Sequence, residues 1–158
     1  MNKKLKIAIS INLDWHMRRY YSFFEGIQSY SSKYTNWALV WDHFPENVLK
    51  TCPDKPYYDG IIGRIKHNAY NEACRLNIPV VNNWFSSDIK DIDSVYTDHE
   101  KAGQMAAEHL LKRGFRNFAS IDTRNEIVAK TFYKGFLGSI KPYGCKIKRY
   151  YIKRKNKR

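Results

Sequence analysis

Five residues that follow predicted strands include four polar or charged side chains and one aromatic ring. They are Asp14, Trp15, Arg64, Asn83 and Asp98. In an open parallel sheet the ligand crevice lies outside the carboxyl ends of the strands, so residues that follow strands converge there. Carboxylate, amide and guanidinium groups can pair with hydroxyls, and an indole can stack on the C–H face of a sugar ring. The mixture is typical of a sugar site. Trp84 also follows a predicted strand, and the alternative is that Trp15 and Trp84 only fill space at the rim of the sheet.

Alternating apolar runs and helical stripes predict the elements that position these residues. Strands are expected at 5–11, 37–41, 61–62, 79–81, 95–96, 115–121 and 145–152. Helices are expected at 18–34, 46–50, 69–76, 98–113 and 127–140. This alternation predicts an α/β fold with a doubly wound, mostly parallel sheet covered on both faces. Thr97 and Glu100 fit a capping box at the start of the helix at 98–113.

The positive charge is concentrated at one end of the chain. The 158 residues contain 28 Lys and Arg and 15 Asp and Glu, which gives a formal net charge of +13. Nine of the cations follow Ile140, and no acidic residue lies among them. A basic segment of this kind can bind nucleic acid by releasing counterions. Direct nucleic-acid binding through residues 146–158 is therefore one hypothesis, and a merely solvated end is the other.

The sequence lacks the motifs of the common catalytic and cofactor sites. It has no glycine-rich phosphate loop, no HExxH and no GxSxG, and its five histidines are scattered. We therefore expect no enzyme activity, no metal and no cofactor. Its three cysteines are an odd number without a close pair, and no run approaches the roughly eighteen apolar residues of a membrane span. The first thirteen residues predict a strand rather than a signal peptide, so we expect a reduced, cytoplasmic protein with no membrane partner.

One long segment resembles a known family. Residues 95–116 are VYTDHEKAGQMAAEHLLKRGFR: a strand ends in an aspartate, a helix with small residues follows, and a Leu-Leu-x-x-Gly-Phe-Arg turn leads to the next strand. The segment resembles the sensor domain of the lactose- and galactose-repressor (LacI/GalR-type) family, which has a type I periplasmic-binding-protein-like fold. The runs DGII at 59–62 and IPVV at 78–81 are similar to the third and fourth strands of that family.

Two further runs point to one branch of this family. EGIQSY at 25–30, followed by WAL at 37–39, and GIIGRI at 60–65 are similar to the xylose-operon activator (XylR-like) type, in which an AraC-type helix-turn-helix module follows the sensor. The resemblance covers roughly residues 5–140. It implies the sugar-sensing N-terminal part of a bacterial transcription regulator, with a pentose such as xylose as ligand and a homodimer as the complete protein.

The resemblance also implies how the chain is organised. Residues 1–122 would form the first lobe of the sensor, and residues 123–158 would begin the second lobe and carry the basic tail. We expect DNA to be bound only by a module absent from this chain, which would then be truncated; a non-functional fragment is the alternative. A truncated second lobe would leave Phe132, Phe136 and Leu137 without most of their partners and the strand at 145–152 unpaired, so we expect the isolated chain to be oligomeric or poorly soluble.

Overall fold

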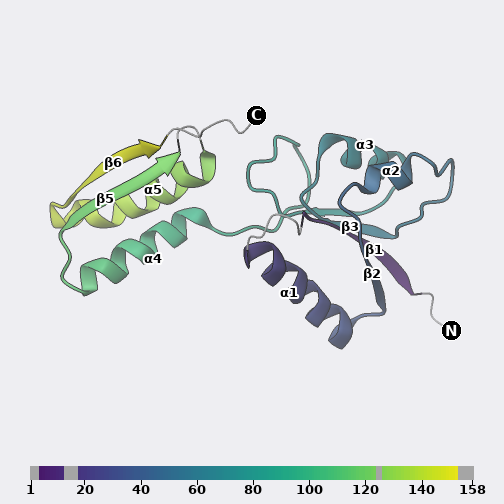
Figure 1. Cartoon of the computed structure of the whole chain (residues 1–158), viewed down its shortest axis with the longest axis horizontal. Coiled ribbons are helices and arrows are strands. Elements are labelled where there is room, and N and C mark those ends of the chain that lie inside the picture. The colour runs from purple at the N-terminus through teal and green to yellow at the C-terminus, as the bar shows by residue number, and fades with distance from the viewer. Residues whose placement is uncertain (1–3, 13–17, 124–125, 153–158) are drawn as a thin grey trace. The chain divides into compact units, whose positions relative to one another are not determined.

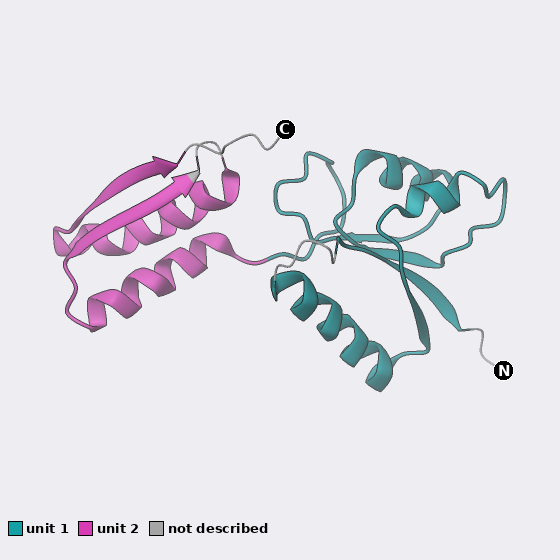
Figure 2. Ribbon diagram, in the orientation of Figure 1, with its two compact units in different colours: residues 1–96 teal, residues 97–158 magenta. Residues whose placement is uncertain are grey.

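The computed structural model describes residues 4–12, 18–123 and 126–152 (Figure 1). The contacts between its Cα atoms divide the chain into two compact units, residues 1–96 and residues 97–158 (Figure 2).

Unit 1, residues 1–96, is a parallel sheet with helices on both faces. In spatial order its strands are β2 (Trp37–Trp41), β1 (Leu5–Ser10), β3 (Gly60–Gly63) and β4 (Val80–Asn82). Its helices are α1 (Arg18–Tyr34), α2 (Pro45–Leu49) and α3 (His67–Arg75). Helix α1 covers one face, and α2 and α3 cover the other (Figure 1). This is the doubly wound, parallel arrangement that the alternating pattern predicts.

Strand β1 lies in the middle of this sheet and supplies side chains to both faces. Ile7 and Ile9 pack with Tyr20 of α1, whereas Ala8 packs with Ala73 of α3. Successive residues of a strand point to opposite faces, so a central strand covered on both sides must be apolar at every position. The uninterrupted apolar run from Ile7 to Ile9 follows from that position in the sheet.

One arginine joins the two helices that lie on the same face of unit 1. Arg75, the last residue of α3, donates hydrogen bonds to the backbone carbonyls of Leu49, Cys52 and Pro53 at 3.0, 3.1 and 3.1 Å. These carbonyls lie at and beyond the C-terminus of α2, where the helix leaves acceptors unsatisfied. The planar guanidinium group therefore ties the end of α2 to the end of α3.

Unit 2, residues 97–158, packs two helices on one face of a parallel pair of strands. Its elements are α4 (His99–Lys112), β5 (Asn117–Thr123), α5 (Ile127–Ile140), the 3-10 turn η1 (Lys141–Tyr143) and β6 (Lys146–Ile152). The core is formed by Ala107 and Leu111 of α4 with Phe136 and Ile140 of α5. Phe118 of β5 packs against this core.

Helices α4 and α5 approach each other backbone to backbone. A Cβ atom on Gly103 would collide with the carbonyl of Phe132, and one on Gly135 would collide with the carbonyl of Glu100. Each helix therefore needs a glycine where it meets the other.

The structure corrects the expected division of the chain. Helix α4 and strand β5 were placed in the first lobe, within residues 1–122, but α4 packs on α5 and β5 pairs with β6. The division consequently falls after Tyr96 instead of after Asp122. The physical reason is the glycine-lined contact between α4 and α5, which the local sequence pattern does not reveal.

Two local predictions beside this division are also wrong. Residues 95–96 form no strand, and an isolated bridge joins Asn82 to Ser94 instead. The residue that caps α4 is Asp98, not Thr97: its Oδ1 accepts a hydrogen bond from the N–H of Lys101 at 2.8 Å. Glu100 lies 2.8 Å from Nζ of Lys134 on α5 and so does not reach back to the cap.

The expected exposure at the start of the second lobe is only partly present. Phe136 is 8% exposed because α4 covers it, and Leu137 is half-buried. Phe132 is 37% exposed. Strand β6 is not alone, since it pairs with β5 over seven residues.

Candidate ligand-binding site

The carboxyl ends of three strands of unit 1 are joined at Ser10. This buried residue ends β1 and lies opposite Gly63 of β3 in the sheet register. Its carbonyl accepts a hydrogen bond from the N–H of Arg64 at 2.7 Å, and its hydroxyl donates to the carbonyl of His43 at 3.4 Å. Arg64 and His43 therefore flank the end of the central strand, where an open parallel sheet offers its ligand crevice.

Gly63 allows Arg64 to occupy this position. Its φ is +150°, and a Cβ atom there would collide with the backbone of Ser10. A residue with a side chain would push β3 away from β1 just before Arg64.

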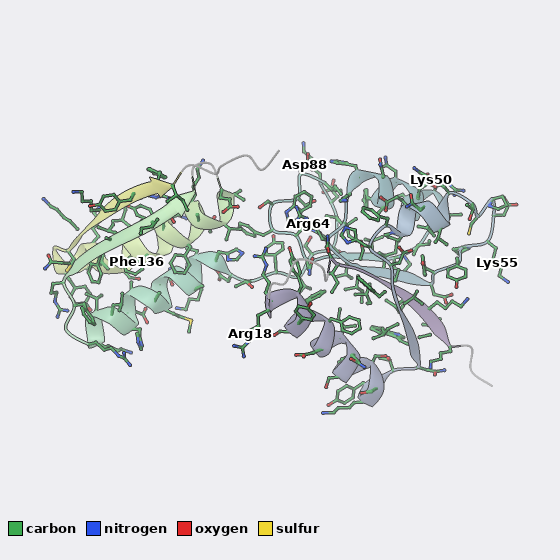
Figure 3. All side chains as sticks on the ribbon, in the orientation of Figure 1. Arg18, Lys50, Lys55, Arg64, Asp88 and Phe136 are labelled. Carbon is green, nitrogen blue, oxygen red and sulfur yellow. The ribbon has the colours of Figure 1, made fainter. Side chains whose placement is uncertain are left out.

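Arg64 stacks on an indole ring. Its guanidinium carbon lies 4.2 Å from the centre of the Trp84 ring, within cation–π distance. Both side chains are half-buried, and Figure 3 labels Arg64 among the side chains of unit 1. The pair thus presents a planar set of donors beside a flat apolar surface at the end of the sheet.

Asn82 holds Trp84 in place. It ends β4 and is 1% exposed. Its Oδ1 accepts from the N–H of Trp84 at 3.0 Å, and its Nδ2 donates to the carbonyl of Trp84 at 3.1 Å. The same Oδ1 accepts from the N–H of Ile65 at 3.4 Å, so one buried amide fixes the segments that follow both β3 and β4.

The structure brings Arg64 and Asn83 together. The N–H of Asn83 donates to the carbonyl of Gly63 at 2.8 Å, one residue before Arg64, and the Asn83 side chain is half-buried. Asp98 belongs to unit 2, where its carboxylate caps α4 and is exposed. Asp14 and Trp15 lie outside the described residues.

His43 is a further polar group at this edge. Its Nδ1 atom is buried and has no hydrogen-bond partner within the described part of the chain, and its ring packs edge-on against Phe44 with centroids 4.2 Å apart. The strand-end rule covers His43, because it follows β2 by two positions. Only the structure shows that this ring nitrogen lacks a partner within the described residues, whereas each carboxylate oxygen of the neighbouring Asp42 accepts a hydrogen bond.

Asp42 has a structural role beside the site. Its Oδ1 accepts from the N–H of Phe44 at 3.0 Å, and its Oδ2 accepts from the hydroxyl of Tyr58 at 2.6 Å. Burial, reinforced by this hydrogen bond and by the negative charge of Asp42, raises the pKa of Tyr58 well above its ordinary value. The phenol therefore stays a donor, and Asp42 holds the turn that carries His43.

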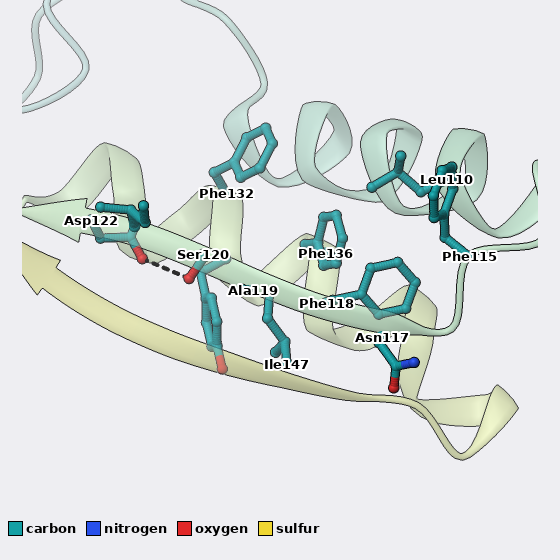
Figure 4. A pocket seen from close by; sticks show the side chains of 12 residues that line it. Leu110, Phe115, Asn117, Phe118, Ala119, Ser120, Asp122, Phe132, Phe136 and Ile147 are labelled. Carbon is teal, nitrogen blue, oxygen red and sulfur yellow. Dashed lines mark hydrogen bonds between the residues drawn. The ribbon is translucent and has the colours of Figure 1, made fainter.

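A separate apolar cavity lies in unit 2. It measures about 410 Å³ and lies beside β5, with Leu110, Phe115, Phe132 and Phe136 in its wall (Figure 4). Ser120 donates to Asp122 at one part of this wall at 3.1 Å. None of the five residues predicted from sequence lines this cavity.

Two further findings bear on the kind of site. Over residues 4–12, 18–123 and 126–152, no three His, Cys, Asp or Glu side chains gather as metal ligands would. No helix in this part of the chain has the length and apolarity that crossing a membrane requires.

Comparison with known proteins gives matches at the level of structure. No family model and no curated protein matches the sequence. A LacI family transcriptional regulator from Enterococcus faecium, solved with bound ribose, is 18% identical with a TM-score of 0.70, and the match covers 91% of this chain and 56% of that one.

Two other solved structures agree. A periplasmic binding protein/LacI transcriptional regulator from Alkaliphilus metalliredigens, complexed with D-xylulofuranose, is 18% identical with a TM-score of 0.63, covering 95% of this chain and 57% of that one. The regulator CcpA of Lactococcus lactis is 13% identical with a TM-score of 0.64, and the match covers 93% of this chain and 59% of that one. This chain thus spans less than two thirds of the length of each, and its α/β architecture is the type I periplasmic-binding-protein-like fold.

Proposed function

We propose that this chain is the sugar-sensing part of a bacterial transcription regulator of the LacI/GalR type, with sequence-specific binding of duplex DNA carried by a module other than residues 1–158. The xylose-operon activator branch remains our proposed relative within that type. In this proposal the complete protein acts in the cytoplasm as a homodimer, has no catalytic activity and needs no cofactor.

The stacked pair of Arg64 and Trp84 at the carboxyl end of the sheet is the observation that carries this proposal. Arg64 would donate hydrogen bonds from its planar fork to vicinal hydroxyls of the sugar. Trp84, held by Asn82, would offer an apolar face to the ring carbons. A sugar needs both kinds of contact at once, and the two side chains lie 4.2 Å apart.

His43 and Asn83 would complete the polar lining of this half of the site. The buried Nδ1 of His43, which has no partner within the described residues, would form a hydrogen bond with a sugar hydroxyl, and this would relieve the cost of burying it. Asn83 can both donate and accept. We also propose Asp14, Trp15 and Asp98 as ligand-binding residues, on the strength of the sequence pattern alone.

The proposed ligand class is a pentose. Two solved structures of the same fold contain bound D-xylulofuranose and bound ribose, and both sugars have five carbons. Because this chain spans little more than half of such proteins, we expect weak binding, with a dissociation constant of about 1 mM or higher.

An NMR titration tests the proposal. The tryptophan indole N–H signals of the chain are followed while D-xylose, D-ribose or the hexitol sorbitol is added. We expect a saturable shift of the Trp84 signal, assigned with Trp84→Phe, for a pentose but not for sorbitol. Arg64→Ala should abolish the shift, whereas Arg113→Ala, an exposed arginine at the end of α4, should not. The absence of any pentose-dependent shift, or its survival in Arg64→Ala, would contradict the proposal.

A further inference from the structure

Unit 2 carries most of the net charge of the chain. Residues 97–158 contain sixteen Lys and Arg against five Asp and Glu, whereas residues 1–96 contain twelve against ten, and no acidic residue follows Glu126. A domain this basic attracts polyanions and repels a second copy of itself. The charge therefore favours a polyanionic partner for unit 2.

The pairing of β5 with β6 gathers part of this charge on one face. Phe118 and Ile147 are opposite each other in the register, and both pack against the core formed by α4 and α5. Successive residues alternate between the faces of a sheet. Lys146, Lys148 and Tyr150 therefore share the opposite face, which we call the outer face of unit 2.

The outer face is exposed and its cations are not neutralised. Lys146 and Lys148 are exposed, and within the described part of the chain neither forms an ion pair. Tyr150 is 47% exposed, and Nζ of Lys148 lies 5.3 Å from the centre of its ring. Ile121, opposite Tyr150 on β5, is 71% exposed and adds an apolar neighbour.

The remaining cation of β6 has a different task. Arg149 points to the helix side, where its Nε lies 2.7 Å from Oδ2 of Asp122 and its guanidinium carbon lies 4.1 Å from the centre of the Tyr133 ring. These contacts fix β6 against β5 and α5. The charge of Arg149 is therefore neutralised on the helix side of the strands, and its contacts stabilise the strand that carries the outer face.

We propose that the outer face of unit 2 binds single-stranded nucleic acid. Lys146 and Lys148 would neutralise backbone phosphates and release counterions. Tyr150 would stack on an unpaired base, which a duplex does not offer. Strands of seven residues span about 20 Å, enough to follow several nucleotides. The interaction would tolerate any sequence, because stacking and phosphate contacts do not distinguish bases.

Fluorescence anisotropy with a labelled oligo-deoxythymidine of about 15 nucleotides, a length that matches known single-strand sites, tests this face in the full chain. The affinity is measured at several salt concentrations. Replacing both lysines (K146Q/K148Q) should reduce the slope of log affinity against log salt by about 1.4, since each phosphate contact on a single strand contributes about 0.7. K112Q/K130Q removes the same charge from the helices of unit 2 and should leave the slope unchanged.

The tyrosine variants separate stacking from charge. Tyr150→Ala should weaken binding about tenfold, whereas Tyr150→Phe should bind like the parent chain. Circular dichroism of each variant confirms that it is folded.

The proposal fails if the control K112Q/K130Q lowers the slope as much as K146Q/K148Q, or if Tyr150→Ala binds normally. It also fails if duplex DNA or polyglutamate of equal charge competes as well as the oligonucleotide, because the partner is then any polyanion. Arg64→Ala, which tests the sugar site, should bind the oligonucleotide normally, so the two proposals stand or fall separately.

Discussion

The hydroxyl of Tyr58 donates a hydrogen bond to Oδ2 of Asp42 across 2.6 Å, which joins the segment that enters β3 to the residue that follows β2. Tyr58 is 2% exposed, so its hydroxyl has been removed from water and depends on this acceptor. The contact supports the turn that carries His43, and it is therefore the first place to test how the site is held.

Tyr58→Phe should lower the free energy of unfolding by about 1–2 kcal/mol, because a hydrogen bond to a charged carboxylate is lost while the ring stays packed. Urea denaturation at neutral pH measures this change. Tyr57→Phe is the matched control: Tyr57 is 46% exposed, and its removal should change stability by less than about 0.5 kcal/mol. Equal losses in the two variants would contradict this account.

The same pair predicts how stability depends on pH. Folding raises the pKa of Tyr58 above its ordinary value of 10.0, so the native state holds the phenol proton more tightly than the unfolded state does. The stability that this difference in pKa contributes is complete below pH 10, and it is lost as the pH rises above 10. Urea denaturation between pH 8 and pH 11 should therefore show stability falling more steeply for the parent chain than for Tyr58→Phe. Parallel curves would disprove the linkage.

Gly63→Ala should destabilise the chain by at least about 2 kcal/mol, since the added Cβ collides with the backbone of Ser10 at a φ that side chains avoid. It should also abolish the pentose-dependent shift of Trp84. Gly26→Ala, in the open middle of α1, provides the control and should stabilise the chain by about 0.5–1 kcal/mol. Thermal unfolding of both variants measures these changes. A Gly63→Ala chain as stable as the parent would contradict the prediction, because β1 and β3 could then move apart without loss of stability.

Two ion pairs of unit 2 should differ in strength. The side chains of Asp122 and Arg149 are 16% and 19% exposed, and a double-mutant cycle with Asp122→Asn and Arg149→Gln should give a coupling energy of about 1–3 kcal/mol. The exposed pair of Glu100 and Lys134 should give less than about 1 kcal/mol in the equivalent cycle. If the two coupling energies are equal, burial does not strengthen the pair of Asp122 and Arg149.

The isolated chain should associate with itself through unit 1. Tyr30 and Tyr34 of α1 are 53% and 72% exposed, their rings lie 5.2 Å apart, and the net charge of residues 1–96 is only +2. An exposed aromatic patch of low charge favours association, whereas unit 2 repels its copy. Sedimentation velocity over a range of concentrations should show a species heavier than 18.7 kDa. A single sharp monomer boundary would contradict this expectation.

The elements of unit 1 could be predicted closely because their signals are local. The apolar run at Ile7–Ile9 and the stripe on α1 are properties of neighbouring residues, and the predicted alternation of strands and helices follows from such signals. The N-cap of α4 was misplaced by one residue, since Thr97 and Asp98 have equivalent capping chemistry and only the local backbone chooses between them. The division of the chain was misplaced because it depends on the close approach of α4 and α5, where Gly103 lies against the backbone of Phe132 and Gly135 lies against the backbone of Glu100.

The sequence by itself determined the class of fold, the candidate residues at the ends of the strands and the concentration of positive charge beyond Ile140. Each of these depends on residue types and on their spacing along the chain. Only the tertiary structure decided which residues meet: Arg64 with Trp84, Ser10 with His43, and Lys148 with Tyr150 on a face opposite Arg149. Such contacts are set by strand order, register and the space left by glycines, and these emerge only when segments far apart in the chain compete for the same core.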